Sequence, residues 1–257
     1  MKLRPFLIAL FAFTLSLSAR ADWGSKVTEP FEFEGSFSPD GIVQVENVNG
    51  RITIEAWDRD AYAISGEKRA KNDDDLELIK IEQEIDRDRI YFKVKLGKKK
   101  GWFNWGNVNG SVNVTLHVPA TVTVKEVSTV NGDVRISGLT GRTHASTVNG
   151  GLEAYNLAGA THMSTVNGGI RAEFTHVDPD ARLEFSTVNG GIRLSLPADA
   201  GVHVSASVVN GHVEADLPIT MKGRIGKKSI NGTIGDGSAS LKASTVNGSI
   251  RIYGTDT

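Results

Sequence analysis

Short runs of alternating apolar and polar residues dominate the chain from residue 106 onward. Apolar residues alternate with polar ones from Ile192 to Leu196, and after a turn the alternation resumes from Val202 to Val208. Alternation with a period of two over about five to seven residues predicts half-buried β-strands, because successive side chains of a strand point to opposite faces. The pattern therefore predicts an all-β fold of short strands joined by tight turns.

A repeated tripeptide, Val-Asn-Gly or Ile-Asn-Gly, joins these runs. It occurs nine times, and from Asn109 onward its spacing is 16 to 22 residues. Five copies extend to Ser-Thr-Val-Asn-Gly, starting at Ser128, Ser146, Ser164, Ser186 and Ser244. Self-similarity at such a period is typical of repeat architectures, so each copy is expected to form one structural unit.

Two folds fit this repeat. Asn-Gly between alternating strands is a strong signal for a hairpin turn, which would give an antiparallel meander. In a parallel solenoid, each repeat is one coil and Asn-Gly lies at a corner where glycine adopts a positive φ. The identity of the repeats favours the solenoid, because in-register stacking brings the same coil position into contact at about 4.8 Å. We therefore predict a parallel β-solenoid, a β-helix or β-roll, with coils of about 18 to 22 residues.

Alignment of the copies on Asn-Gly places like residues in columns. One inward column reads Thr129, Thr147, Thr165, Thr187, Val208 and Thr245, and a column past the corner, which faces water, begins with Arg135, Glu153, Arg171 and Arg193. The Asn residues are expected to form a hydrogen-bonded ladder at one edge, with the members Asn131, Asn149, Asn167, Asn189, Asn210, Asn231 and Asn247. Such a ladder is structural and carries no chemistry of its own.

The part before the regular repeats is less regular. Residues 22–257 are expected to form a single solenoid domain, in which residues 22–105 are irregular and residues 106–257 hold the regular coils. A charged insert is predicted over residues 66–105. Within it, Ile79 to Ile85 and Ile90 to Leu96 predict a β-hairpin, with a helical turn near Asp73 to Leu78. The hairpin is expected to cap the first coil, since an uncapped solenoid exposes strand edges.

Residues 1–21 have the pattern of a secretory signal peptide. Lys2 and Arg4 precede an apolar run from Phe6 to Leu17, and Ala19-Arg20-Ala21 forms a small-x-small cleavage site. The run is shorter than the about 18 to 20 residues of a spanning helix, so no transmembrane segment is expected after cleavage. The chain contains no cysteine. Together these features predict export to the periplasm or cell surface of a bacterium.

At this point the chain resembles a known family. The signal peptide, the Ile-Thr-Ile-Glu-Ala-Trp-Asp at 52–58, the Val-Asn-Val-Thr-Leu-His-Val-Pro-Ala at 112–120 and the run of Val-Asn-Gly coils resemble the bacterial "putative adhesin" family of β-strand-repeat proteins of unknown function. The resemblance covers nearly all of the chain after residue 21. It implies a parallel β-helix or β-roll, and it implies no catalytic or binding residue.

Few residues suggest chemistry. His144 and His162 occupy the same coil position, and with Glu184 they could hold Zn²⁺, although two solvated surface side chains explain the pair better. No H-E-x-x-H, G-x-S-x-G or phosphate-loop motif occurs. The formal net charge of −1 gives no reason to expect nucleic-acid binding. We therefore predict no cofactor, no metal and no catalytic residue.

The most unusual segment combines lysines and aromatic residues: Lys98, Lys99, Lys100, Trp102, Phe103 and Trp105. Lysines are attracted to anionic surfaces and aromatic side chains lie at interfaces, so this segment is the predicted contact with an envelope glycan, a lipid surface or a protein. The alternative is a loop whose rings pack on the first coil.

Three functions are compatible with these features. The favoured one is a non-catalytic exported structural or binding protein, an adhesin-like β-solenoid of the cell envelope. The second is a carbohydrate-active enzyme on a β-helix scaffold, which requires acidic or basic side chains converging in a groove. The third is an envelope accessory protein that binds a protein partner.

Overall fold

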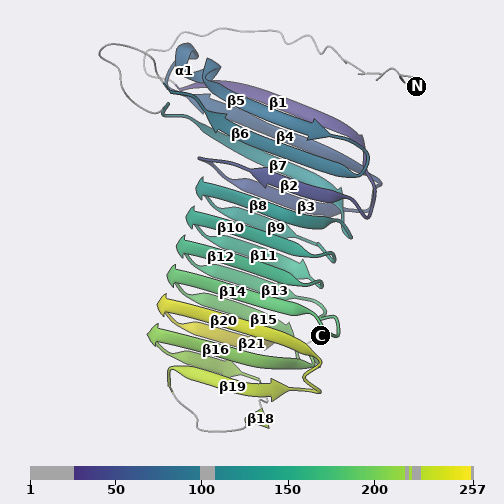
Figure 1. Cartoon of the computed structure of the whole chain (residues 1–257), viewed down its shortest axis with the longest axis vertical. Helices are drawn as coiled ribbons and strands as arrows, with labels where there is room; N and C mark the ends of the chain where they lie inside the picture. The colour runs from purple at the N-terminus through teal and green to yellow at the C-terminus, as the bar shows by residue number, and fades with distance from the viewer. Residues whose placement is uncertain (1–25, 99–107, 218–219, 222–226, 256–257) are drawn as a thin grey trace, which may run out of the picture.

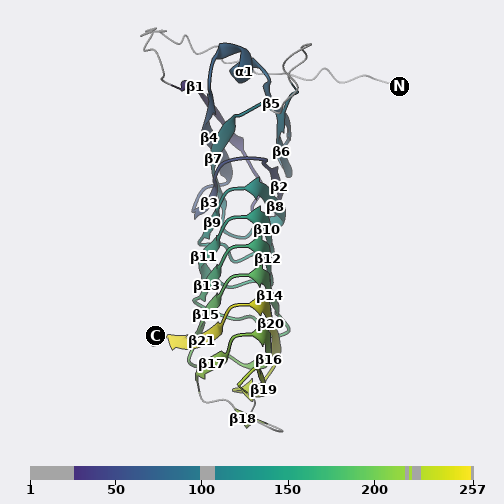
Figure 2. The ribbon, with the colours of Figure 1, turned by 90° about the vertical axis from the view of Figure 1, so that its left-hand side faces the viewer.

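In each repeat, the strand before the Asn-Gly corner and the strand after it belong to different sheets. The two sheets face each other along a tall stack, as the two views of the computed structural model show (Figure 1, Figure 2). The structure describes residues 26–98, 108–217, 220–221 and 227–255. Sheet A has ten strands and sheet B has eleven. One helix, α1 (Asp73–Glu77), lies at the N-terminal end of the stack.

The spatial order of the strands differs from their order in the chain. Sheet A consists, from one edge to the other, of β1 (Val27–Ser36), β4 (Ala61–Ala70), β7 (Ser111–Pro119), β3 (Ile52–Trp57), β9 (Val134–Ser137), β11 (Leu152–Leu157), β13 (Ile170–Phe174), β15 (Ile192–Pro197), β21 (Ile250–Thr255) and β17 (Val213–Asp216). Sheet B consists of β18 (Thr220–Met221), β19 (Ser229–Ile234), β16 (Val202–Asn210), β20 (Ala239–Asn247), β14 (Arg182–Asn189), β12 (Thr161–Asn167), β10 (Thr143–Asn149), β8 (Thr123–Asn131), β2 (Ile42–Glu46), β6 (Arg89–Leu96) and β5 (Ile79–Ile85).

Strands of successive coils pair in parallel, with the repeat residues in register. In sheet B, β10 pairs with β12 so that Ser146 lies beside Ser164 and Asn149 beside Asn167. In sheet A, β11 pairs in the same way with β13. The strands on the two sides of each regular Asn-Gly corner belong to different sheets, so the corner is not a hairpin turn. The parallel stacking predicted from the identity of the repeats is confirmed.

The last two strands interrupt the chain order of the coils. β20 lies between β14 and β16 and pairs in parallel with both, and β21 lies between β15 and β17. The yellow C-terminal strands of Figure 1 are accordingly enclosed by green ones. The alignment listed the columns in chain order, and this order is wrong at the C-terminal end of the stack. In space, Thr245, Asn247 and Arg251 come before Val208, Asn210 and Glu214.

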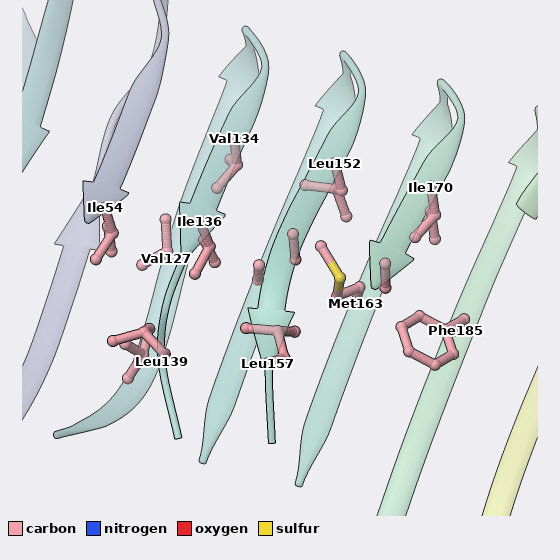
Figure 3. Close-up of a cluster of buried hydrophobic side chains, with 14 of the residues drawn as sticks. Ile54, Val127, Val134, Ile136, Leu139, Leu152, Leu157, Met163, Ile170 and Phe185 are labelled. Carbon is pink, nitrogen blue, oxygen red and sulfur yellow. The ribbon is translucent and has the colours of Figure 1, made fainter. Parts of the chain in front are cut away.

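Apolar side chains from both sheets fill the space between them. Met163 and Phe185 of sheet B lie among Leu152, Leu157 and Ile170, which come from strands β11 and β13 of sheet A (Figure 3). All five are at most 2% exposed. Burial of apolar surface at about 25 cal/mol per Å² makes this continuous core the main source of stability.

The close stacking of the corners explains the Thr and Gly of the repeat. The buried hydroxyl of Thr165 donates to the carbonyl oxygen of Gly150 in the neighbouring coil at 3.0 Å, and Thr147 and Thr187 make equivalent bonds. A Cβ atom on Gly168 would lie 1.8 Å from that same Gly150 oxygen. The positive φ expected for glycine at the corners is found at Gly50, Gly211 and Gly248, but Gly168 is not among the glycines that have it. At Gly168 glycine is required because a side chain does not fit.

The N-terminal end extends both sheets beyond the first coil. β5 and β6 form the predicted antiparallel hairpin, and β6 pairs in parallel with β2. The predicted helical turn is α1, which Asn72 caps by accepting a hydrogen bond from the Asp75 amide at 2.9 Å. Residues 66–70, which the sequence pattern assigned to the insert, instead complete β4, which pairs with β1 and β7. No helix within the described residues has the length and hydropathy needed to span a membrane.

Candidate functional site

One edge of the stack carries a continuous ladder of Asn side chains. Asn149 Nδ2 donates to Asn131 Oδ1 at 2.8 Å, and equivalent bonds of 2.8 to 2.9 Å link the other neighbours. Every Nδ2 points toward the N-terminal end, where Asn49 donates to the Gly110 carbonyl oxygen at 3.0 Å. The spatial order of the ladder is Asn49, Asn131, Asn149, Asn167, Asn189, Asn247 and Asn210. Each inner amide both donates and accepts, so the ladder ties neighbouring coils together.

Asn231 does not join this ladder. It lies inside β19, which runs antiparallel to β16 and places Asn231 opposite Ser205. The Ile-Asn-Gly at 230–232 is therefore part of a strand and makes no corner. The tripeptide alone did not distinguish this copy from the others, because the same three residues can form a corner between two sheets or lie within a strand.

Across β8, β10, β12, β14, β20 and β16, two outward columns of sheet B each contain a single residue type, whereas Glu46 of β2 takes the position beside Ser128. We call them together the Ser–Val face: the serines are Ser128, Ser146, Ser164, Ser186, Ser244 and Ser207, and the valines are Val130, Val148, Val166, Val188, Val246 and Val209. Each of these valines is 39 to 56% exposed. The face is thus a flat surface of small side chains edged by an apolar stripe.

The fold does not require serine and valine at the positions of the Ser–Val face. The Thr, Asn and Gly of the repeat each make a contact between coils, whereas its Ser and Val point outward. The next outward column on the same sheet is free to vary, since it reads Glu126, His144, His162, Glu184, Lys242 and Ser205. A high β-propensity favours Val at an outward position, but Ile and Thr share that property. Packing therefore does not account for the uniformity of the Ser–Val face.

The Ser–Val face could have been predicted from the sequence. Alternation correctly places the Ser and Val of Ser-Thr-Val-Asn-Gly outward, but outward residues were interpreted as solvent-facing by default. The informative feature was that an outward position repeats one residue without change, where solvation alone tolerates many residue types.

The column beside the Ser–Val face contains the two histidines singled out from the sequence. The rings of His144 and His162 meet edge to face with centroids 4.7 Å apart, and His162 Nδ1 lies 3.2 Å from Glu184 Oε2. Burial lowers the pKa of His144, the neighbouring His162 lowers this pKa further, and Glu126 opposes both. Within the described parts of the chain, no group of three or more His, Asp or Glu side chains is placed to hold a metal ion. The zinc arrangement considered from the sequence thus finds no ligand set there.

A shallow groove of about 810 Å³ lies over these histidines, where the strands of sheet B begin. Besides His144 and His162, its charged lining consists of Lys125, Arg142, Asp180, Arg182 and Glu184. Lys125 reaches the surface because β8 bulges opposite β10, which leaves both Lys125 and Glu126 outside the core. The groove therefore combines basic, acidic and imidazole groups in one open surface.

The structure does not test the predictions made for two regions, the lysine and aromatic segment and the signal peptide. Lys98 is exposed at the end of the described segment. Lys99, Lys100, Trp102, Phe103 and Trp105 lie outside the described residues, as do residues 1–21 of the predicted signal peptide. The contact predicted for the lysine and aromatic segment therefore rests on sequence alone.

Comparison with known proteins gives one family match and several structural matches. The model of the family described as Toastrack DUF4097 matches residues 107–253, which include all the regular coils. No curated protein matches the chain. A solved structure described as a "putative cell adhesion protein" from Clostridium sporogenes is 13% identical and covers 88% of this chain and 100% of its own, with a TM-score of 0.49.

Two further solved structures are similar at lower scores. A "putative adhesin" from Bacteroides fragilis is 11% identical, covers 87% of this chain and 97% of its own, and has a TM-score of 0.34. A "putative lipid binding protein" from Parabacteroides distasonis is 14% identical, covers 90% of this chain and 98% of its own, and has a TM-score of 0.32.

Proposed function

This chain belongs to the Toastrack DUF4097 family, and from the surface that its coils present we propose that it is a non-catalytic, adhesin-like binding protein of the bacterial cell envelope. Its coils form a rigid scaffold, and its binding surface is the Ser–Val face. We further propose that residues 1–21 direct its export to the periplasm or cell surface.

The observation that carries this proposal is the uniformity of the Ser–Val face. Six coils present the same serine and the same half-exposed valine, although the contacts between coils depend on neither residue. Contiguous exposed apolar surface on a protein is typical of an interaction site. Extended surfaces built from stacked repeats are also the usual binding surfaces of solenoids.

The geometry of the face favours an extended partner. The six valines span five strand spacings, or about 24 Å, with one contact point every 4.8 Å or so. A partner that lies along the stack makes the same weak contact at each coil, and the contacts add through their high effective concentration. Substitution of several coils together should therefore weaken binding far more than substitution of one.

The test is binding of the fluorescently labelled protein to bacterial envelope fractions. In the variant V148T/V166T/V188T, Thr keeps the branched shape of each Val and replaces one of its two methyl groups with a hydroxyl. The matched control, E153Q/R171Q/R193Q, changes the outward residues of sheet A on the same three coils. We expect the valine variant to lose most of its binding and the control to keep it. Equal binding by the valine variant and the parent would exclude the Ser–Val face as the binding surface.

The same assay separates the proposal from its two alternatives. Prior protease treatment of the envelope fraction abolishes binding if the partner is a protein, as expected for an accessory protein. Incubation with envelope polysaccharides leaves their chain length unchanged if the protein is non-catalytic. Shortened chains would establish the carbohydrate-active enzyme instead.

A second contact is proposed for the segment from Lys98 to Trp105 on the basis of its composition. Three lysines and three aromatic residues in this segment combine attraction to anionic surfaces with a preference for interfaces. The variant W102A/F103A/W105A is expected to lose binding to anionic liposomes or to envelope glycan while the thermal unfolding midpoint stays unchanged. Unchanged binding to both would remove this segment as a contact.

A further inference from the structure

We propose that the groove over His144 and His162 binds an acidic polysaccharide, a chain of sugars that carry carboxylates, laid along the axis of the stack. This inference rests on the proposed function, because it names the ligand class of a second site on the same outer face of sheet B. The site is distinct from the Ser–Val face, so the two can be tested separately.

Three cations line the groove without a carboxylate partner. On the outer face of sheet A, Arg135 pairs with Glu153 at 2.5 Å and Arg251 with Glu214 at 3.0 Å. Lys125, Arg142 and Arg182 are exposed, and none of them forms an ion pair with a carboxylate of the described residues. These three side chains are therefore available for an anionic ligand. An arginine guanidinium can bind a carboxylate through two parallel hydrogen bonds, and the Lys125 ammonium attracts it as a point charge.

The strand register arranges the cations along the stack. Arg142, Ala160 and Arg182 each come one residue before a set of residues that pair in register across β10, β12 and β14. The two arginines are therefore two strand spacings apart, about 10 Å, with only the methyl group of Ala160 between them. On β8 the matching position is Thr123, and Lys125 lies two residues farther along that strand, in the bulge opposite β10. A chain with anionic groups at intervals matches this row better than one small anion does.

The remaining groove residues favour a sugar chain of moderate charge. Asp180 and Glu184 line the groove together with the three cations, so the formal charge with neutral histidines is 3 − 2 = +1. A polymer as densely charged as polyphosphate would place anions against these two carboxylates. A polysaccharide instead presents hydroxyl groups, which donate hydrogen bonds to carboxylates and imidazoles, between its own carboxylates.

The described lining also argues against single-stranded nucleic acid. Proteins that bind such strands stack the bases on aromatic side chains. The described groove residues include no Phe, Tyr or Trp. A sugar chain needs no such platform, because its recognition here comes from charge and hydrogen bonding.

The experiment measures binding of the full chain to an oligogalacturonate of about ten sugars by calorimetry, since several sugars are needed to span the row of cations. Its methyl ester has the same backbone without the charges, and polyphosphate has the charges without the hydroxyl groups. We expect binding of the acidic oligomer only. In R142Q/R182Q the dissociation constant should rise about tenfold or more, because two charge-assisted contacts are lost. The control R171Q/R193Q on sheet A should bind as the parent does.

Three results would overturn the proposal. They are equal binding of the acid and its ester, unchanged affinity of R142Q/R182Q, and equally tight binding of polyphosphate through the same arginines. The variant V148T/V166T/V188T makes the failure of each proposal distinguishable. If it loses envelope binding but keeps oligogalacturonate binding, both sites stand. If R142Q/R182Q binds the oligomer normally while V148T/V166T/V188T still fails on the envelope, only the groove is rejected.

Discussion

At the residue scale, neighbouring glycines of one corner have different roles. A Cβ atom on Gly150 would lie 1.9 Å from the Gly132 carbonyl oxygen, whereas on Gly151 its nearest contact would be 3.6 Å away. The first overlap involves backbone on both sides and cannot relax by a side-chain movement. The corner therefore needs glycine at one of the two positions only.

Substitution at these two positions should have unequal effects. We expect G150A to lower the free energy of unfolding by about 3 kcal/mol, as overpacking does in a rigid site. G151A should change it by less than about 0.5 kcal/mol, the usual range for a surface change. Denaturant titration of both variants measures the difference. Equal stabilities would mean that the corners are not stacked as closely as the structure has them.

The role of the buried threonine column can be tested by removing one threonine and by adding another. T165V removes the hydroxyl that donates to the Gly150 carbonyl oxygen, so we expect it to cost about 1 to 2 kcal/mol of unfolding free energy. Val208 fills the same column position in β16, beside Thr245. V208T should therefore gain a bond to the Gly248 corner and keep or raise stability. A loss of stability in V208T equal to that in T165V would contradict this account of the column.

The histidine pair should give a measurable pH dependence. Burial lowers the pKa of His144 and His162 adds to this effect, while Glu126 opposes it. The charged groups facing the pair are Lys125, Arg142, Asp180, Arg182 and Glu184. In H162N the pKa of His144, followed by NMR titration, should rise toward its ordinary value. An unchanged pKa would mean that burial alone accounts for the shift.

The sign of the stability effect follows from this direction. The unfolded chain binds a proton on His144 more readily than the folded chain does, so stability from this group is present above the ordinary histidine pKa of about 6.5. It decreases as pH falls from there through the lower folded pKa. H162N should reduce that decrease.

At the element scale, the sequence allowed prediction of the coils but not their order. Alignment on Asn-Gly correctly gave the parallel register and the buried Thr column, and the two strand-like runs of the insert correctly gave the N-terminal hairpin. It could not show that β20 lies between β14 and β16, because each coil carries the same columns and fits beside any other. The order depends on connections that the repeat pattern does not encode, including the reversed strand β19. For the same reason Asn231 was assigned to a ladder that it does not join.

Disulfide trapping tests this strand order directly. The chain has no cysteine, so introduced pairs are the only thiols. Ser186 and Ser244 lie side by side on β14 and β20, whereas Ser207 of β16 is one strand farther away. We expect S186C/S244C to crosslink on mild oxidation. S186C/S207C should not, because Cα atoms two strands apart, about 10 Å, exceed disulfide reach. The reverse result would restore the chain order of the coils.

At the scale of the whole molecule, the stack resembles a one-dimensional array whose stability comes from contacts between neighbouring coils. In such an array the terminal coils open most easily, and chain termini usually fray. Here the C-terminal strands are not terminal in space. β20 and β21 pair on both sides in both sheets, and the true edges at that end are β17 and β18.

Hydrogen exchange of the full chain should therefore show a protected C-terminal segment. Amides of β20 and β21 must wait for both neighbouring coils to open, so their exchange should be as slow as that of β12 in the middle of the stack. Amides of β17, a four-residue edge strand, should exchange much faster although they come earlier in the chain. Mass spectrometry of peptic peptides from 239–255, 213–216 and 161–167 compares the three. Fast exchange over 239–255 would mean that the last coil is added loosely to the stack and does not hold its neighbours together.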